Sequence, residues 1–570
     1  MTRTTNEGLP NEPIFEQLLA LPRKVNHVMV HDPSNGVDAD SIRLLTDLVR
    51  MRSFLRASLP RSMFDEAGIF LQEDKPYIFV LSDGNYEFII AALSILSIGG
   101  AVVPLPTGIL SEEALHIARR CESGTVLGSR DHLQTAKSIG RYASSHGFPI
   151  AVLPIQINTA PDIDLESPEM AVNPRLEISA ARPGLLLFTS GSMGPPKGVV
   201  HARRLYYELH KSSSPDDVLL SHQPPHWAGA VIPLVRQVLA GARTEVIVSE
   251  PYALWKRLRA GGVTFLMGPP RLWILMMRYY QEHIALKLPS DEVEVYLRGA
   301  QQLRCARVSG MMPHPALLRF WRGEIGRPLQ VAYSSTELCG GGLSADPWKI
   351  SDESQLGRCI GRPDASFTVR LSEGDHGEMQ VKSTTMFTHY LGDEGATRAA
   401  FTDDGFYRTG DLVRRVGDDY CMDGRESAEF VKFRGYKVPI LEVEMRLLDL
   451  PFIADGCILS ATSQDSAGRV AALVRFQAGS SCLKFLQDSL APSLPAYMLP
   501  TMLRVLQDGD EIPRSASLKV LRHKAVEQYF ALSEDMKLPL NVECRLVDQD
   551  ALARPPRAWD WGGLQSASKT

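Results

Sequence analysis

The chain has 570 residues, which is too long for one hydrophobic core, so we expect two or more domains. With 44% hydrophobic and 22% charged residues, the composition is that of a soluble globular protein and not of a disordered or fibrous chain. The net charge of -5 argues against general binding to nucleic acid or to an anionic membrane.

The sequence also lacks several motifs of other protein classes. None of the 8 cysteines stands in a Cys-x-x-Cys pair, so no zinc or dithiol motif is present. The N-terminus has no apolar signal core and the last residues are not a peroxisomal signal, so we expect the cytoplasm. The most apolar window, residues 88–105, is interrupted by Gly99, Gly100 and Pro104. This interruption predicts a buried helix that runs into a strand instead of a membrane span.

The N-terminal third alternates between helix and strand patterns. Residues 41–55 are amphipathic, and they are followed by a predicted strand over 77–81, a helix over 86–98 and a strand over 101–105. This alternation predicts a parallel sheet with crossover helices. Residues 160–182 are polar and rich in proline, which is typical of a linker.

The central part continues the same alternation. An apolar run over 185–188 predicts a buried strand. After it, the patterns predict helices over 203–211, 231–239 and 272–283, strands over 218–223, 244–248, 263–267, 329–333 and 378–382, and a short strand that ends at 307–310. The predicted fold class is α/β: a large N-terminal domain of stacked αβ sheets with a small β-barrel-like region, followed by a small mobile α+β C-terminal domain.

Changes in composition and in the pattern of predicted helices and strands divide the chain into four predicted segments. They are an N-terminal extension over 1–60, a nucleotide-binding domain over 61–423, a mobile C-terminal domain over 424–530 and a tail over 531–570. The border rests on Asp423-Gly424-Arg425, after which the predicted strands and helices become short. The tail is predicted to be disordered because it holds Pro-Pro, Gly-Gly and a serine-rich end.

A loop directly after the predicted strand 185–188 has the chemistry of a phosphate site. Residues 189–197 read Thr-Ser-Gly-Ser-Met-Gly-Pro-Pro-Lys. Hydroxyl groups supply hydrogen-bond donors, glycines let the backbone approach a bulky anion, and Lys197 adds a positive charge. The spacing is not the Walker pattern, because Pro196 precedes the lysine and no Ser or Thr follows it. The plain alternative is an ordinary Gly/Pro/Ser loop.

Four further motifs follow the loop in order. They are Tyr-Ser-Ser-Thr-Glu over 333–337, Phe-Tyr-Arg-Thr-Gly-Asp-Leu over 406–412, Gly-Arg at 424–425 with 431–438, and Pro-Arg-Ser-Ala-Ser-Leu-Lys over 513–519. With the loop, this series resembles the adenylate-forming acyl-CoA synthetase superfamily, which includes luciferases and peptide-synthetase adenylation domains. Within it, Arg-Val-Ser-Gly over 307–310, 435–438 with 441–444, and 490–492 with 511–514 look most similar to malonyl-CoA synthetases.

The resemblance implies a two-step reaction that uses ATP, Mg²⁺ and CoA. A carboxylate attacks the α-phosphate of ATP, and the thiol of CoA then displaces AMP from the acyl-AMP. The acid is expected to be small and di- or polycarboxylic, with malonate as the type case. The protein need supply no covalent nucleophile, because its work is positioning and charge neutralisation.

The resemblance also assigns residues to the nucleotide. Glu337 is expected to ligate Mg²⁺ and Lys519 to act as the adenylation lysine, delivered by closure of the small domain. The plain alternatives are a helix first-turn acid and a surface lysine. The phosphate loop supplies Thr189, Ser190, Gly191, Ser192, Met193, Gly194 and Lys197, and the α-phosphate and ribose are expected to contact Ser335, Thr336, Asp411 and Arg425.

The acyl and thiol sides are assigned in the same way. His226 and Trp227 match the family's gate to the acyl pocket, although a packed Trp beside a turn His is the plain alternative. An arginine clamp for a second carboxylate could be Arg304, Arg307, Arg271 or Arg236, and the sequence leaves this choice open. The expected pocket set is completed by Gly310 and Met311, the CoA side by Gly435, Tyr436 and Lys437, and the hinge by Ser427.

Several positions depart from the family pattern and keep other functions open. Met193, Ser334, Met311-Met312 and Leu518 put bulk where relatives keep small residues. Met311-Met312 argue against a long straight fatty acid. The departures allow two alternatives: an adenylating enzyme that loads a carrier-protein thiol, and a non-catalytic nucleotide-binding homologue that serves as an interaction module. The retained charged residues at 197, 337, 411, 425 and 519 favour the enzyme.

Overall fold

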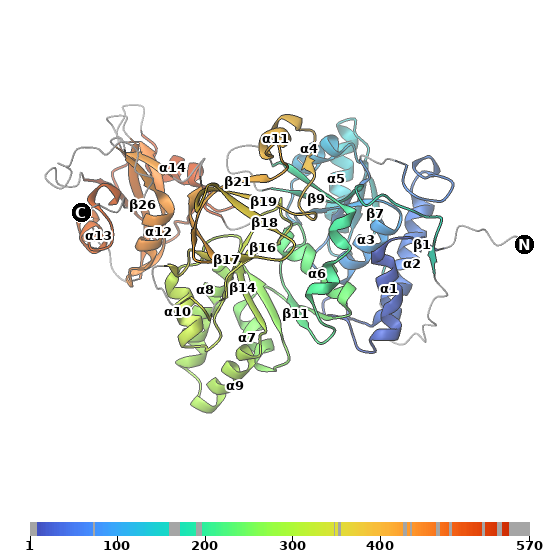
Figure 1. The fold of residues 1–570 in the computed structure, drawn as a ribbon, viewed down its shortest axis with the longest axis horizontal. Coiled ribbons are helices and arrows are strands. Elements are labelled where there is room, and N and C mark those ends of the chain that lie inside the picture. The colour runs from blue at the N-terminus through green and yellow to red at the C-terminus, as the bar shows by residue number, and fades with distance from the viewer. Residues whose placement is uncertain are drawn as a thin grey trace, which may run out of the picture.

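The computed structural model describes residues 8–71, 75–158, 171–189, 196–346, 348–350, 355–425, 430–433, 436–462, 468–477, 482–515, 519–532 and 538–545. Two large sheets with their helices form the body, and a smaller sheet with its own helices forms a separate lobe at the C-terminal end (Figure 1). The predicted α/β fold with a large N-terminal and a small C-terminal domain is confirmed.

A seven-stranded sheet carries the predicted phosphate loop. Its strand order is β20-β10-β9-β5-β4-β6-β7. Five neighbouring strands are parallel, and β10 and β20 are antiparallel to their neighbours. The bounds are β4 Tyr77–Leu81, β5 Ala101–Leu105, β6 Thr125–Gly128, β7 Ala151–Pro154, β9 Pro183–Phe188, β10 Gly198–Ala202 and β20 His389–Tyr390, with helices α3 Tyr86–Ser97, α4 Ser111–Cys121 and α5 Leu133–Ser145 between the parallel strands.

Burial explains why this region was predictable from sequence. Every residue of β4, α3 and β5 is buried, so an uninterrupted apolar pattern marks all three. The side chain of Asn85 accepts a hydrogen bond from the Phe88 N–H and caps α3. Gly99 ends the helix with φ +79°, and a Cβ there would lie 2.8 Å from Ile69. The predicted strands over 77–81 and 101–105 and the helix between them are confirmed.

A second sheet of 13 strands runs through the body in the order β18-β19-β21-β22-β17-β16-β15-β14-β13-β11-β12-β2-β3. Its central strands are parallel, and the pairing becomes antiparallel from β15 to β16 onward. The predicted barrel-like region corresponds to these antiparallel strands, which continue the same sheet. The bounds are β2 Val30–Asp32, β3 Val37–Ala39, β11 Val218–Ser221, β12 Arg243–Val246, β13 Phe265–Gly268, β14 Cys305–Ser309, β15 Gln330–Ser334, β16 Gly342–Ser344, β17 Cys359–Pro363, β18 Thr368–Glu373, β19 His376–Lys382, β21 Tyr407–Val416 and β22 Asp419–Arg425.

Helices accompany the strands of this sheet. Strands β11, β12, β13 and β14 are followed along the chain by α6 Ala228–Ala240, α7 Pro251–Arg259, α8 Pro270–Tyr279 and α10 Pro315–Gly323, with the π-helix Tyr280–Ala285 extending α8, α9 Ser290–Gln301 preceding β14 and α11 Glu394–Ala400 preceding β21. The helix predicted over 203–211 is replaced by two 3₁₀ turns, Arg203–Tyr206 and Leu209–Ser212. Arg203 is fully buried and bound to Glu12 and to the carbonyls of Leu96 and Gly100, so it points inward from a tight turn.

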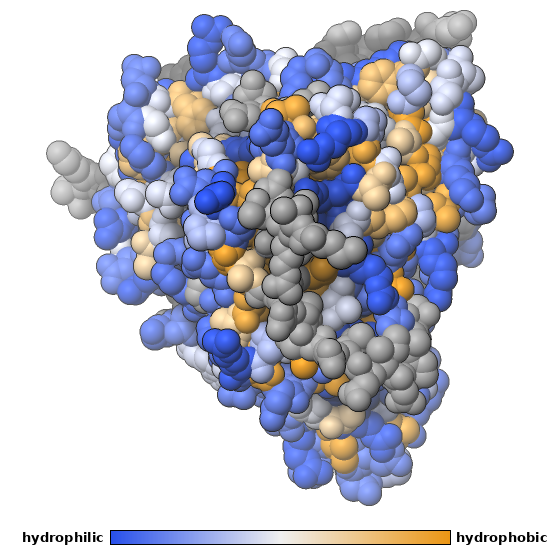
Figure 2. Space-filling model, turned by 90° about the vertical axis from the view of Figure 1, so that its right-hand side faces the viewer, coloured by the Kyte–Doolittle hydropathy of each residue, from blue (hydrophilic) through white to orange (hydrophobic). Residues whose placement is uncertain are grey.

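The N-terminal residues are part of the body and not an appendage. Helices α1 Pro13–Lys24 and α2 Ser41–Ser58 bury apolar residues in the same core as α3. Strand β2 pairs with β12, and the short strands β1 Leu9–Pro10 and β8 Val172–Asn173 pair with each other. The extension predicted over 1–60 is therefore integrated over its described residues, 8–60. The face that these helices present is largely polar, with separate apolar patches (Figure 2).

The C-terminal lobe is built on a four-stranded sheet, β25-β26-β27-β28, and a two-stranded ribbon, β23-β24. Its edge strand β28 pairs with β27, so ordered structure continues past the predicted tail boundary at residue 530. Residues 546–570 lie outside the described part of the chain. The bounds are β23 Phe430–Phe433, β24 Tyr436–Pro439, α12 Ile440–Leu448, β25 Ile453–Thr462, β26 Gly468–Phe476, α13 Leu483–Leu490, β27 Met502–Val505, α14 Arg522–Phe530 and β28 Val542–Cys544.

The described residues contain no helix that is both long enough and apolar enough to span a membrane.

Candidate active site

The predicted phosphate loop leaves the seven-stranded sheet between β9 and β10. Two hydrogen bonds close its base: the Thr189 N–H donates to the Lys197 carbonyl at 3.0 Å, and the Lys197 N–H donates to Thr189 Oγ1 at 3.2 Å. The antiparallel pairing of Phe188 with Gly198 continues this base into the sheet. The loop residues Ser190, Gly191, Ser192, Met193 and Gly194 lie outside the described residues. These bonds fix the two ends of the loop at the end of β9 and the start of β10.

Lys197 and Glu337 meet at Tyr390. The Lys197 ammonium lies 5.0 Å from the centre of the Tyr390 ring, and the Tyr390 hydroxyl donates to Glu337 Oε1 at 2.9 Å. Glu337 lies in a turn after β15 and not in the first turn of a helix, so the helix-dipole alternative does not apply. A cation from one motif and a carboxylate from another are thus brought to one corner of the molecule.

The turn that carries Thr336 and Glu337 rests on a buried histidine. His201 Nε2 of β10 donates to the Thr336 carbonyl at 2.9 Å. Burial lowers the pKa of His201 to about 4, so the ring is neutral at pH 7 and offers a single N–H. Within the turn, Ser335 Oγ accepts from the Leu338 N–H at 3.3 Å. One hydrogen bond from β10 and one within the turn itself therefore hold the turn in place.

The motif that contains Asp411 joins the same region through Tyr333. The Tyr333 hydroxyl donates to Asp411 Oδ2 at 2.5 Å, and Tyr333 lies in β15 just before the turn of Thr336 and Glu337. Asp411 is buried and pairs directly with Arg425 across β21 and β22. The side chain of Arg425 lies outside what the structure describes. The predicted α-phosphate, metal and ribose residues thus belong to one sheet, in which the Tyr333–Asp411 hydrogen bond joins β15 to β21 across the intervening strands.

An arginine that the sequence analysis missed supports the phosphate loop. Arg120 of α4 donates to the Pro196 carbonyl at 3.3 Å and to the Leu391 carbonyl at 3.1 Å. It links the end of the loop to the residue after Tyr390. No local pattern distinguishes Arg120 from other helix arginines, because its role depends on a partner 271 residues away.

The predicted acyl gate lies where β11 leads into α6. The rings of His226 and Trp227 make an edge-to-face contact with centroids 5.7 Å apart. Burial lowers the pKa of His226 to about 4, and within the described chain neither ring nitrogen has a hydrogen-bond partner. Gly310 follows β14 with φ +86° and nothing near a would-be Cβ, and Met311 is half-buried beside it. A buried imidazole without a hydrogen-bond partner, at the start of a helix, is available to form a hydrogen bond with a bound ligand.

The structure separates the four candidate arginines. Arg304 pairs with the buried Asp217 at 2.5 Å, its guanidinium lies 5.0 Å from the centre of the Phe265 ring, and so it is already occupied. Arg271 is exposed on α8. Arg307 Nε donates to Gln330 Oε1 at 3.1 Å.

Arg236 of α6 is different from the other three. Among the described residues, its Nε and Nη2 are buried atoms with no hydrogen-bond partner. Desolvation, together with the positive charge of the nearby Arg307, lowers the pKa of Arg236 to about 10. Although Asp217 partly offsets this effect, the unpartnered donors of Arg236 beside Arg307 make these two arginines a candidate site for an anion.

Lys519 lies in the C-terminal lobe, at the base of a short loop. The Ser515 N–H donates to the Lys519 carbonyl at 2.8 Å, and the Lys519 N–H donates to Ser515 Oγ at 3.2 Å. Arg514 ties this loop to Asp455 at 3.1 Å. Tyr436 and Lys437 belong to β24, with side chains outside the described set, and Gly435, Ser427 and Leu518 also lie outside it.

The lobe contacts the body through α12. His314 is hydrogen-bonded to the Met445 carbonyl at 3.1 Å, Arg319 pairs with Asp449 at 2.6 Å, and Arg358 pairs with Glu442. These polar contacts are typical of an interface between domains that move relative to each other.

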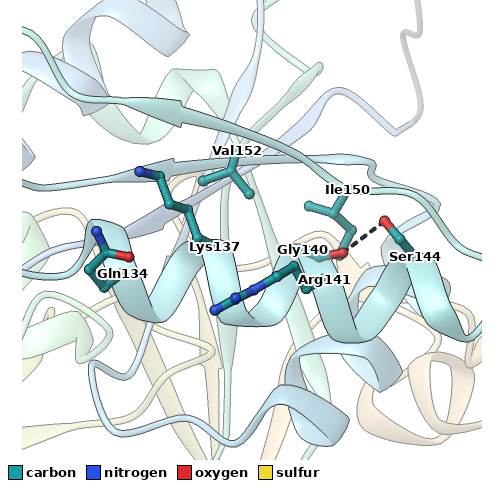
Figure 3. A pocket seen from close by; sticks show the side chains of 7 residues that line it. All are labelled: Gln134, Lys137, Gly140, Arg141, Ser144, Ile150 and Val152. Carbon is teal, nitrogen blue, oxygen red and sulfur yellow. Dashed lines mark hydrogen bonds between the residues drawn. The ribbon is translucent and has the colours of Figure 1, made fainter.

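A shallow groove on the edge of the seven-stranded sheet is not this site. It has a volume of about 570 Å³ and lies between α5 and β7, where Lys137 and Arg141 extend from the helix (Figure 3). Its lining residues include none of the candidate residues.

Comparisons with known proteins agree with this geometry. The model of the AMP-binding enzyme family matches residues 62–391. The chain is 35% identical over 534 residues to an acyl-CoA ligase of Aspergillus oryzae, oryP, covering 92% of this chain and 93% of the relative. It is 26% identical over 489 residues to a malonate–CoA ligase of Arabidopsis thaliana, covering 78% and 76%.

Solved structures show the same fold. The ATP-bound MatB of Rhodopseudomonas palustris has a TM-score of 0.70 at 18% identity, covering 90% of this chain and 98% of that one. The o-succinylbenzoate CoA synthetase of Bacillus subtilis, in complex with its acyl-adenylate, has a TM-score of 0.71 at 20% identity, covering 90% and 97%. The chain belongs to the AMP-binding enzyme family. The prediction of an AMP-forming acid–thiol ligase is confirmed at the level of enzyme class.

Proposed function

We propose that this protein is an ATP-dependent acyl-CoA ligase whose acid carries a second carboxylate, with malonate as the type case. The observation that carries the proposal is Arg236, whose buried donors lack a partner and whose neighbour Arg307 is also cationic. A carboxylate placed between two guanidinium groups would satisfy those donors and cancel the repulsion. An unbranched fatty acyl chain would leave both costs in place.

The lining around these arginines also favours a short acid. Alternate residues of β11, β13 and β14 contribute a small apolar cluster of Leu219, Phe265, Met267 and Cys305. Cys305 stands two residues before Arg307 and therefore on the same face of β14. The proposed acid site thus combines a small apolar cluster with strong positive charge. Several relatives are named malonate–CoA ligases, which agrees with this chemistry.

ATP and CoA are the co-substrates of this enzyme class, and the nucleotide roles follow the converging residues. The loop from Thr189 to Lys197 would hold the β- and γ-phosphates, and Asp411, with two acceptor oxygens, would take the ribose hydroxyls with Arg425 beside it. Thr336 would donate to the α-phosphate together with Ser335. The proposed attack needs the acid's carboxylate aligned with that phosphate, which is a matter of positioning.

Mg²⁺ fits the residues present. Glu337 places a carboxylate beside Lys197 and the base of the phosphate loop, and a hard cation is commonly bound by one carboxylate and phosphate oxygens. The bound ion would neutralise phosphate charge. Lys519 would add the ammonium that offsets charge at the α-phosphate, brought by movement of the C-terminal lobe.

For the second half-reaction, the formation of the thioester, we propose the same residues as those predicted from the sequence. Gly435, Tyr436 and Lys437 would face the CoA thiol after a rotation about Ser427, and a carrier-protein thiol is the alternative acceptor. The cytoplasm stays the predicted compartment, although four animal relatives, from Bos taurus, Homo sapiens, Xenopus laevis and Mus musculus, are named as mitochondrial.

The test is pyrophosphate release over a panel of acids, with and without CoA. The panel contains malonate, methylmalonate, succinate, acetate, octanoate and benzoate, and monomethyl malonate serves as the control that removes one charge. We expect malonate or another short diacid to release pyrophosphate well above the no-acid blank, and monomethyl malonate to be much weaker. Preference for octanoate or benzoate would reject the diacid, and ATP binding without turnover of any acid would favour the non-catalytic alternative.

A further inference from the structure

The segment 387–390 contacts Glu337 at two points. The Phe387 N–H donates to the Glu337 backbone carbonyl at 2.8 Å, and the Tyr390 hydroxyl donates to the Glu337 carboxylate at 2.9 Å. The first bond fixes the main chain of Glu337 and the second fixes the direction of its side chain. Because the main chain and the carboxylate of Glu337 are both held, the residue loses little conformational freedom when it binds a ligand, which favours tight coordination.

Tyr390 is itself held rigidly. It lies in β20, pairs directly with Val199 of β10, and packs against the Phe387 ring with centroids 4.9 Å apart. The buried Tyr407 ring makes an edge-to-face contact with the same Phe387 ring, with centroids 5.2 Å apart, so it braces this segment as well.

The ring of Tyr390 has a second task. Its face lies under the exposed Lys197 ammonium at 5.0 Å, and Val199 is only two residues after that lysine. One side chain therefore orders the carboxylate through its hydroxyl and the ammonium through its ring. Because Arg120 binds the carbonyls on either side, at Pro196 and Leu391, the loop end and Tyr390 are kept in register.

We infer that Tyr390 is a positioning residue that couples the metal carboxylate Glu337 to the phosphate lysine Lys197. This inference rests on the proposed roles of those two residues. In this role Tyr390 contacts neither the reacting atoms of the nucleotide nor the acid. It acts through the two groups that do, and the two tasks can be separated by substitution.

The experiment compares calorimetric ATP binding in excess EDTA with binding in excess Mg²⁺ for four variants of the full chain. Tyr390→Phe keeps the ring and removes the hydroxyl, and Tyr390→Leu removes both. Tyr207→Phe is the matched control, because it removes a tyrosine-to-glutamate bond of the same 2.9 Å length, to Glu12, away from the site. Glu337→Gln tests the proposed metal role directly.

We expect Tyr390→Phe to bind ATP in EDTA as the wild type does, but to lose about tenfold of the affinity that Mg²⁺ adds, since a hydrogen bond to a charged group is removed. Tyr390→Leu should also weaken binding in EDTA about threefold, through loss of the ring under Lys197. As a second measurement, the half-saturating Mn²⁺ concentration of the ATP complex, followed by electron paramagnetic resonance, should rise in both Tyr390 variants and stay constant in Tyr207→Phe.

The outcomes separate this inference from the proposal beneath it. If Glu337→Gln keeps the full Mg²⁺ effect, the metal role of Glu337 is wrong and the coupling is lost with it. If Glu337→Gln loses the effect while Tyr390→Phe keeps it, only the role of Tyr390 is wrong. If Tyr207→Phe behaves like Tyr390→Phe, the effect is general loosening of the fold and the inference is overturned.

Discussion

Replacing Arg236 with methionine should make the free protein more stable and the enzyme less selective. The pKa of Arg236 is lowered from 12.5 to about 10, so the charged form is disfavoured in the folded state. At about 1.4 kcal/mol per pKa unit, holding this charge costs the fold about 3 kcal/mol at neutral pH. Methionine has a similar length and no charge, so we expect Arg236→Met to raise the free energy of unfolding by about 1–3 kcal/mol.

The same change removes the group proposed to bind the second carboxylate. Loss of a charge-assisted, bidentate contact should lower kcat/KM for malonate by about 100-fold, while monomethyl malonate changes by less than about threefold. Urea unfolding and pyrophosphate release with the two acids measure both effects. The matched control is Arg304→Met, which removes the salt-bridge partner of the buried Asp217 and should therefore destabilise the fold without changing the preference between acids.

A specific pair of results would refute this reasoning. If Arg236→Met destabilises the protein and reduces both acids to the same degree, Arg236 has a structural partner and does not select the substrate. If Arg304→Met instead abolishes the preference, the clamp has been placed on the wrong arginine.

Three further predictions concern the fold. Glu12→Gln leaves the fully buried Arg203 without its charge partner and should cost about 3–5 kcal/mol in urea unfolding; a loss below 1 kcal/mol would contradict the buried pair. His201 has a folded pKa of about 4, below its unfolded value, so the stability that depends on its neutral ring is complete above pH 6.5 and is lost as the pH falls towards 4. From pH 7 to pH 5, the free energy of unfolding of the wild type should fall by about 2 kcal/mol more than that of His201→Gln. Gly361→Ala should reduce stability far more than Gly374→Ala, because both have φ near +75° but only at Gly361 would a Cβ lie 2.0 Å from a carbonyl oxygen; equal thermal unfolding midpoints would contradict this.

Burial decided which parts of the fold could be predicted from the sequence. The strands β4 and β5 are buried on both faces, so an unbroken apolar run marks them, and their predicted bounds match the structure. The 3₁₀ turns that replace the predicted helix at 203–211 depend on the partner of Arg203, Glu12, which lies 191 residues away. Local spacing carries no information about such a partner.

The candidate site divides in the same way. Short motifs marked Lys197, Glu337 and Asp411 because each combines a charged residue with turn-forming neighbours. Tyr390 was not identified from the sequence, and Arg236 was only one of four candidate arginines, since the importance of both comes from what surrounds them. Among the candidate arginines, only the three-dimensional structure shows that Arg304 has found a carboxylate and that Arg236 has not.

The pairing of β28 with β27 matters for anyone who shortens this chain. Ending the protein at Phe530 would strip away Val542–Cys544 and leave the outer hydrogen-bonding groups of β27 open to solvent. An exposed edge strand can pair with strands of other molecules, so the shortened protein would aggregate through β27 although its hydrophobic core is intact. A trimmed protein should therefore keep its residues through Arg545, whose N–H donates back to the Thr501 carbonyl at 2.9 Å.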